Sequence, residues 1–249
     1  MSLTLKQLVS DWERMTVDLS RKKMKAPFFV VNPKSFLFGK PLMDLAHYAD
    51  QLAKEHRIDI LFTAPLTELA IIAQECPNLI VTSQHMDNIV PGDSMGRVLP
   101  ESLKQIGVQA VVVNHADKPI PFSILASTIQ RAKEVGLLTI ACADSISEGQ
   151  AMALLGPDIV LAEPTELIGR DQMSDRVYVT STIEKIKEIN PAILVEQGAG
   201  IRSEKDVAEL LQLGADGVGV TSGIVKAENP KEMMKRMIQA VALHQKERK

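Results

Sequence analysis

The sequence predicts a single (β/α)8 barrel, and three observations carry this prediction. After Pro27, eight short runs rich in Val, Ile and Leu alternate strictly with eight longer segments of helical periodicity. The short runs are hydrophobic without interruption, which is typical of strands buried on both faces of a parallel sheet. The chain has 249 residues, a usual length for one such barrel. Strict alternation of this kind favours a closed barrel over an open sheet.

Each expected strand is four to six residues long and is followed by polar or glycine-containing sequence. The eight expected strands are Phe28–Asn32, Ile58–Thr63, Leu79–Ser83, Ala110–Asn114, Leu137–Cys142, Ile159–Ala162, Ile193–Gln197 and Gly217–Val220.

Helices are expected between the strands, and several carry recognisable start and stop signals. The expected helices are Pro41–His56, Thr67–Glu75, Pro100–Ile106, Pro121–Glu134, Ser145–Leu155, Thr180–Ile189, Ser203–Leu213 and Pro230–Gln245. Ser145 with Glu148, and Ser203 with Asp206, have the spacing of a capping box. The four prolines that open expected helices suit a first turn. Glycines follow four of the helical runs, where a left-handed cap ends a helix; they are Gly107, Gly136, Gly156 and Gly214.

Residues 1–26 are predicted to form a helical extension that packs outside the barrel, within one domain spanning residues 1–249. The apolar residues between Leu5 and Leu19 are spaced roughly as one face of a helix, with charged residues between them. A helix that binds a partner or a membrane surface is the alternative, but the charge of this segment is mixed rather than basic.

Composition excludes several classes of partner. The net charge is −3, with acidic and basic residues interspersed, so we expect no nucleic acid and no membrane as partners. No apolar run approaches the roughly 18 residues that span a bilayer. The two cysteines, Cys76 and Cys142, are far apart and lack metal-ligand spacing. These features favour a cytoplasmic protein without disulfides.

Chemistry-bearing residues are expected where the strands end, because sites in such barrels form at the C-terminal ends of the strands. Lys34, His115 and Glu163 each stand just beyond a different expected strand. A carboxylate can take a proton from carbon, a neutral imidazole can polarise a carbonyl oxygen, and a lysine can stabilise the developing negative charge. This set predicts an isomerase that moves a proton next to a carbonyl, with no cofactor and no metal.

Each of these residues alone has a plainer explanation. A lysine after a strand is usually solvated, a histidine at a strand end is often structural, and a glutamate after a buried run can be held by an ion pair.

Two small, uncharged loops are candidates for binding phosphate. The segments 198–200 (Gly-Ala-Gly) and 221–223 (Thr-Ser-Gly) follow expected strands 7 and 8, where phosphate is frequently bound in this fold. These glycines can also simply make tight turns. The segment 164–172 after Glu163 is either a lid that closes over the site or an ordinary surface loop.

Together these motifs resemble the triosephosphate isomerase family, especially its shorter archaeal-type branch, from about Pro27 to the C-terminus. The matching motifs are Asn32-Pro33-Lys34, Gln84-His85, Asn114-His115, Glu163-Pro164 with Ile168-Gly169, and Gly198-Ala199-Gly200-Ile201. Cys142 matches a cysteine of the family after strand 5. The resemblance implies a (β/α)8 TIM barrel that interconverts dihydroxyacetone phosphate and glyceraldehyde 3-phosphate in glycolysis and gluconeogenesis.

The resemblance also implies a role for each matching residue. Glu163 would be the base that forms an enediolate, His115 the neutral electrophile, and Lys34 a catalytic and substrate-binding cation, while Asn32 would help to orient the sugar phosphate. Backbone groups would hold the phosphate at Gly169, Gly200, Ile201, Ser222 and Gly223. The 84–99 loop is similar to the family's dimer-forming loop and implies a homodimer or a homotetramer.

The chain departs from the family's pattern at three places. Ala116-Asp117 stands where the family usually has Ser-Glu, Gly169-Arg170-Asp171 where it has Gly-Thr-Gly, and the N-terminal extension is additional. The changed residues near the substrate leave a tetrulose phosphate open as the substrate.

Two further alternatives stay open. One is a non-catalytic protein that binds a phosphate ligand. The other is a metal-dependent epimerase or aldolase with His85, Asp87, His115 and Asp117 as ligands.

Overall fold

Eight parallel strands close into a barrel in a computed structural model that describes residues 22–168 and 174–248. The strands are β1 (Phe28–Val31), β2 (Ile60–Ala64), β3 (Ile80–Ser83), β4 (Ala110–Val113), β5 (Leu138–Ala143), β6 (Ile159–Ala162), β7 (Leu194–Gln197) and β8 (Gly217–Val220). Each pairs with its neighbours in sequence, and β1 closes the barrel against β8, with Val30 opposite both Leu61 and Gly219. The predicted fold class and strand order are confirmed.

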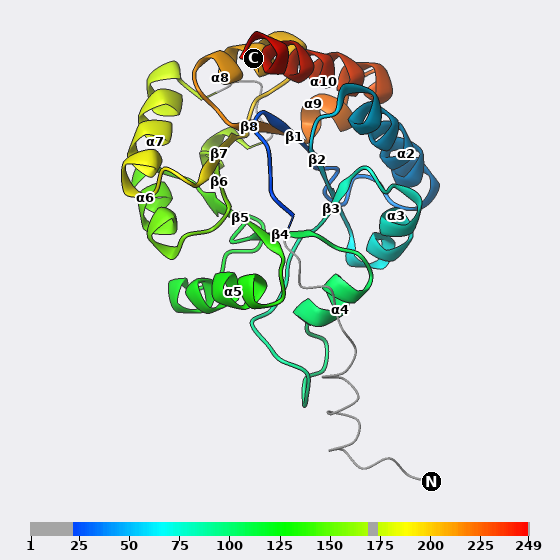
Figure 1. The fold of residues 1–249 in the computed structure, drawn as a ribbon, viewed down its shortest axis with the longest axis vertical. Helices are drawn as coiled ribbons and strands as arrows, with labels where there is room; N and C mark the ends of the chain where they lie inside the picture. Colours follow the sequence, from blue (N-terminus) through cyan, green and yellow to red (C-terminus); the bar gives the residue numbers. More distant parts are fainter. Residues whose placement is uncertain (1–21, 169–173, 249) are drawn as a thin grey trace.

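Helices surround the barrel, as Figure 1 shows. They are α2 (Gly39–His56), α3 (Leu69–Glu75), α4 (Pro100–Gln105), α5 (Phe122–Glu134), α6 (Ile146–Leu155), α7 (Arg176–Ile189), α8 (Glu204–Gln212), α9 (Ser222–Val225) and α10 (Pro230–Glu247), with 3-10 turns η1 (Leu66–Glu68) and η2 (Thr165–Leu167). The sequence missed α9, which is a single turn. It also placed the start of α7 four residues late, because the Asp175 side chain caps this helix by accepting from Val177 N at 2.6 Å.

The predicted helix signals are mostly correct. Ser203 and Asp206 form a complete capping box at the start of α8. Ser145 caps α6 by accepting from the N–H of Glu148 at 3.2 Å, but the Glu148 carboxylate turns elsewhere, so this second box is incomplete. Pro121 occupies the N-cap of α5 rather than its first turn. The four glycines predicted to end helices all have positive φ, as a left-handed cap requires: Gly107, Gly136, Gly156 and Gly214.

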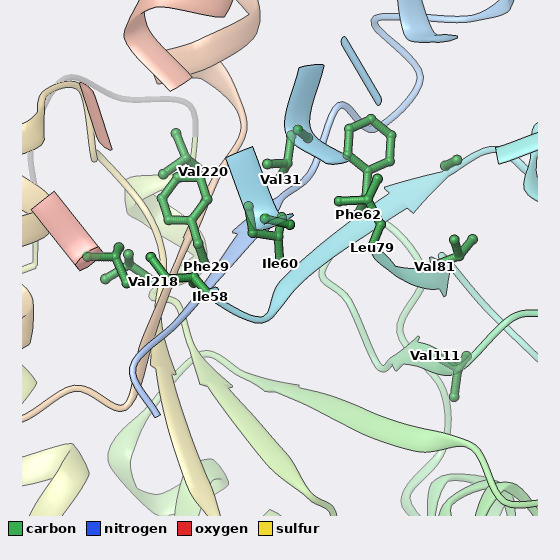
Figure 2. Packing of buried hydrophobic residues seen from close by; sticks show 14 of the residues in the cluster. Phe29, Val31, Ile58, Ile60, Phe62, Leu79, Val81, Val111, Val218 and Val220 are labelled. Atoms are coloured by element: carbon green, nitrogen blue, oxygen red, sulfur yellow. The ribbon is translucent and has the colours of Figure 1, made fainter. Parts of the chain in front are cut away.

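Both faces of the strands are buried, which explains their unbroken hydrophobicity. Alternate residues point outward to the helices, and Figure 2 shows part of this outer layer, including Phe29 and Ile60. The other residues, such as Phe28 and Leu61, fill the barrel interior. Gly217 lies against the Phe28 ring, and a side chain there would overlap it. The interior is therefore a packed core that leaves only its C-terminal end for a site.

The predicted N-terminal helix falls on residues that lie mostly outside the described part of the chain. Residues 22–26, which are described, contain no helix. The prediction of a helical extension reaching residue 26 is therefore wrong for these five residues. Met24 packs against the interior cluster of the barrel, and the N–H of Lys25 donates to Asp59 at 3.0 Å. In the described residues, no helix has the length and apolar character that a membrane crossing requires.

Candidate active site

Asn32, Lys34, His115 and Glu163 come together at the C-terminal end of the barrel, as predicted. They follow β1, β4 and β6 and line one small cavity of about 30 Å³. Nε2 of His115 lies 3.8 Å from Oε2 of Glu163. Residues separated by more than a hundred positions therefore meet because parallel strands carry their C-terminal ends to the same rim.

Glu163 has the environment of a carboxylate that can act as a base. Its Oε1 accepts a hydrogen bond from the backbone N–H of Ala199 at 3.0 Å, and only 17% of its side chain is exposed. Burial raises the pKa of this carboxyl, while the Lys34 charge and the Ala199 hydrogen bond oppose the rise. A raised pKa makes a carboxylate a stronger base for a carbon-bound proton.

His115 is a neutral imidazole whose proton lies on the side of the cavity. Its Nδ1 accepts from the backbone N–H of Asp117 at 3.0 Å, which places the ring proton on Nε2, beside Glu163. Burial and then the Lys34 charge lower the pKa of His115. The Asp117 carboxylate, 3.3 Å from Nδ1, pulls in the opposite direction, but it is 70% exposed and screened by water. His115 can therefore donate a hydrogen bond from Nε2 at neutral pH.

Lys34 is held in an unusual backbone conformation, with φ of 48°. Its N–H donates to Oδ1 of Asn32 at 3.2 Å, and its carbonyl accepts from Nε2 of Gln84 at 3.0 Å. Thr63, which the sequence analysis did not single out, donates to the same Asn32 oxygen at 2.5 Å. Nζ of Lys34 contacts Oδ2 of Asp117 at 3.0 Å, and this contact lowers the pKa of Asp117. Hydrogen bonds to its backbone and the ion pair of its Nζ with Asp117 thus hold Lys34 at the cavity.

Asn114 shapes the turn that presents His115. It has φ of 58°, and its Oδ1 accepts from the N–H of Ile120 at 3.1 Å. Its Nδ2 donates to Oε1 of Glu148 at 3.1 Å, while Oε2 of Glu148 accepts from the N–H of Asp144 at 2.8 Å. The carboxylate that should have completed a capping box therefore ties the loops after β4 and β5 together. The spacing of Glu148 from Ser145 in the sequence predicted only a helix cap, not this contact between loops.

The predicted phosphate loops lie beside this cavity. Gly200, Ile201 and Ser222 line a neighbouring cavity of about 130 Å³, which Glu163 also borders. Gly223 does not line it. Instead, Gly223 packs so closely against the Ile201 carbonyl that a side chain there would overlap that oxygen. Gly169 lies outside the described residues. So do Arg170 and Asp171, and only the start of the expected lid, with η2, is described.

Lys226 is a cation at this cavity that the sequence analysis missed. It follows α9, borders the 130 Å³ cavity, and places its Nζ 5.8 Å from the centre of the Phe36 ring. A positive charge and free backbone N–H groups are what an anionic group requires. Nothing in the local sequence distinguishes this lysine from a surface lysine.

A larger cavity of about 560 Å³ opens beside Lys34 and His115, and the 84–99 loop forms one of its walls. His85 and Asp87 lie on this loop, 3.5 Å apart. These two residues, His115 and Asp117 were the candidate metal ligands. Within the described residues, no group of three or more His, Cys, Asp and Glu side chains is arranged to hold a metal ion.

The chemistry of this rim defines a class of protein, namely a (β/α)8-barrel isomerase that transfers a proton beside a carbonyl group. Comparison with known proteins is consistent with this class. The model of the family described as triosephosphate isomerase matches residues 27–241. The triosephosphate isomerase of Methanocaldococcus jannaschii is 34% identical over 217 residues, which cover 85% of this chain and 99% of the relative.

Two further relatives carry the same name. That of Methanosarcina barkeri is 34% identical over 88% of this chain and 100% of its own length. That of Saccharolobus solfataricus is 30% identical over 86% of this chain and 96% of its own length. The chain belongs to the triosephosphate isomerase family, as the motifs predicted.

Proposed function

We propose that the chain interconverts dihydroxyacetone phosphate and glyceraldehyde 3-phosphate through an enediolate. The observation that carries this proposal is the placement of Glu163, His115 and Lys34 around one cavity, with His115 neutral. The names of the relatives support the choice of substrate. We also assign the reaction to the cytoplasm, because Cys76 and Cys142 are both free and buried.

In the proposed reaction, the Glu163 carboxylate removes a proton from the carbon next to the carbonyl. The electron pair of that C–H bond forms the carbon–carbon double bond, and negative charge develops on the carbonyl oxygen. The Nε2–H of His115 hydrogen-bonds to this oxygen and Lys34 stabilises its charge. His115 gives its Nε2 proton to this oxygen and takes the proton of the neighbouring hydroxyl oxygen, which restores the neutral imidazole. Glu163 then returns its proton to the former carbonyl carbon, and the former hydroxyl oxygen becomes the carbonyl oxygen of the aldehyde.

The remaining expected residues hold the substrate in the same proposal. Asn32 orients it through the Lys34 backbone. Gly200, Ile201 and Ser222 line the cavity that we assign to the phosphate, which their backbone N–H groups would bind, and Lys226 adds a charge there. Gly223 supports this wall by packing rather than by contacting the ligand.

The direct test is a coupled turnover assay with glyceraldehyde 3-phosphate on the wild type and on Glu163→Gln. Loss of the base should lower kcat by about 10²–10⁴-fold. The matched control is Glu184→Gln, which removes an exposed carboxylate on α7 and should retain wild-type turnover. Full activity in Glu163→Gln would refute this mechanism. Loss of activity in a strong chelator would support the metal-dependent alternative instead.

A tetrulose phosphate is the second candidate substrate, and one observation favours it. A cavity of about 220 Å³ lies on the flank of Glu163, bordered by Ala116, Asn114, Cys142 and Glu148. The volume of this cavity gives that side of the base space for one more hydroxylated carbon. A kcat/KM for a tetrulose phosphate above that for the triose phosphates would establish this substrate. Binding by calorimetry without any turnover would indicate a non-catalytic protein.

We further propose that the chain forms a homodimer or homotetramer through the 84–99 loop. Figure 1 shows this loop projecting away from the barrel between β3 and α4. Met95 is 97% exposed and Val90 is 61% exposed. The 560 Å³ cavity at the base of the loop could take a few side chains from the loop of a second copy, which would then lie beside Lys34 and His115.

A further inference from the structure

A second carboxyl lies in the barrel interior beneath the candidate site. Glu196 is the third residue of β7, and it is only 2% exposed. Val195 before it belongs to the outer layer between barrel and helices, so the Glu196 side chain points inward. There it lines the same cavity of about 30 Å³ as Glu163, Lys34 and His115. This volume is about that of one water molecule.

A glycine leaves space for this carboxyl, and one of its two oxygens is without a partner in the described part of the chain. Gly219 on β8 lies directly against Oε1 of Glu196, and any side chain at position 219 would overlap that oxygen. Oε2 of Glu196 is buried and has no hydrogen-bond partner within the described residues. An ionised carboxylate in such a position is costly, and the usual response of the group is to keep its proton. Burial, followed by the charge of Glu163, raises the pKa of Glu196 to about 8.

Among the described residues, four other titratable groups face this part of the barrel. They are Glu163 after β6, Lys34 after β1, His115 after β4 and Cys142 within β5. Burial and the nearby carboxylates raise the pKa of the Cys142 thiol, and His115 is neutral, so neither adds charge. Lys34 is the cation of this group, and it is already paired with Asp117. It can balance one cavity carboxylate but not two.

We propose that Glu196 is a positioning residue that must carry a proton for the site to work. As a neutral acid it leaves Glu163 as the anion of the cavity, beside Lys34. Once Glu196 loses its proton, a second negative charge lies next to both the base and the enediolate, which is itself negative. Like charges at short range oppose each other strongly in a buried cavity. Catalysis should therefore decline on the alkaline side as Glu196 ionises. This inference rests on the proposed isomerase function.

The first test is the pH dependence of kcat/KM between pH 6 and 9.5 with glyceraldehyde 3-phosphate. With a pKa of about 8, about a tenth of Glu196 keeps its proton at pH 9. The wild type and the control Glu184→Gln should therefore fall about tenfold from their plateau at pH 9. Glu196→Gln and Glu196→Leu, which cannot ionise, should not show this fall. An alkaline decline of equal size in all four proteins would overturn the proposal.

The second test needs no substrate. The folded chain keeps the Glu196 proton up to about pH 8, whereas the unfolded chain releases it at the ordinary glutamate pKa near 4.5. The contribution of Glu196 to the free energy of unfolding of the wild type should therefore decrease as pH rises from about 4.5 to 8. The Tm of Glu196→Gln relative to the wild type should rise over this interval and stay level above it. A constant Tm difference from pH 5 to 9 would show that Glu196 is ionised throughout and would overturn the proposal.

The two tests separate this inference from the proposed function. A wild type that turns over no triose phosphate at any pH would refute the proposed function. The Tm comparison would still decide whether Glu196 holds its proton.

Discussion

The Oε1 atom of Glu163 accepts a hydrogen bond from the backbone N–H of Ala199 at 3.0 Å. The loop after β7, which borders the cavity proposed to hold the phosphate, thus also contacts the candidate base. Gly198 lies at the centre of this arrangement, since a Cβ at that position would stand 2.9 Å from Oε1 of Glu163 and 3.1 Å from Leu161. A side chain there would displace the carboxylate from its position beside Ala199.

We therefore expect Gly198→Ala to lower kcat more than it changes KM. Displacement of a base by about 1 Å can cost on the order of 10²-fold in rate. Steady-state kinetics with glyceraldehyde 3-phosphate measure this. The control is Gly149→Ala inside α6, where the nearest atom to a Cβ would be Cδ1 at the flexible end of Ile186, at 3.1 Å. If both variants retain wild-type kcat, then the Ala199 contact does not position Glu163.

Replacing Lys34 with methionine should change both the rate and its pH dependence. The Lys34 charge lowers the pKa of Glu163 and of His115, so its removal raises both pKa values. Glu163 then takes up a proton, and His115 becomes charged, at a higher pH than in the wild type. The acidic limb of kcat/KM should shift to higher pH, and the plateau should fall by about 10²–10³-fold. An acidic limb at the wild-type position would contradict this electrostatic role.

The Gly219→Ala variant tests the packing of Glu196 through the free energy of unfolding, without an activity assay. The new methyl group would overlap Oε1 of Glu196, and overpacking of this kind costs about 1–3 kcal/mol of unfolding free energy. In the double variant with Glu196→Ala, the overlap disappears and the cost of the Gly219 change should shrink. Urea denaturation of the wild type, both single variants and the double variant gives this coupling. Additive effects would show that the two residues do not contact each other.

Met95→Glu tests the proposed assembly. Met95 is 97% exposed on the 84–99 loop, and replacing this apolar side chain with a charged one should weaken its apolar contact with a second copy. Sedimentation velocity should then show a shift towards monomer relative to the wild type. The matched control is Leu154→Glu on α6, which replaces another well exposed apolar side chain away from the loop. This variant should sediment like the wild type. An unchanged sedimentation coefficient in Met95→Glu would exclude the loop as the interface.

Much of the fold was determined by the sequence alone. The strands were predictable because a strand buried on both faces is mostly apolar, and most of the strands end where polar residues begin. Glycine at the helix ends and Ser203 with Asp206 act within one turn of backbone, so their effect does not depend on the rest of the chain. Lys34, His115 and Glu163 were found for a related reason, because the end of each strand marks the rim of the barrel.

Only the tertiary structure determined which residues far apart in the sequence contact each other. Glu148 has the spacing of a capping residue, yet its carboxylate binds Asn114 from the neighbouring loop, 34 positions away. The pairing of Lys34 with Asp117 joins the ends of β1 and β4. The inward direction of Glu196 follows from the register of β7, which places it opposite Leu161 on one side and Gly217 on the other. A sequence specifies which residues end or interrupt a strand, but only the closed barrel brings their charges into one cavity, where burial sets their protonation.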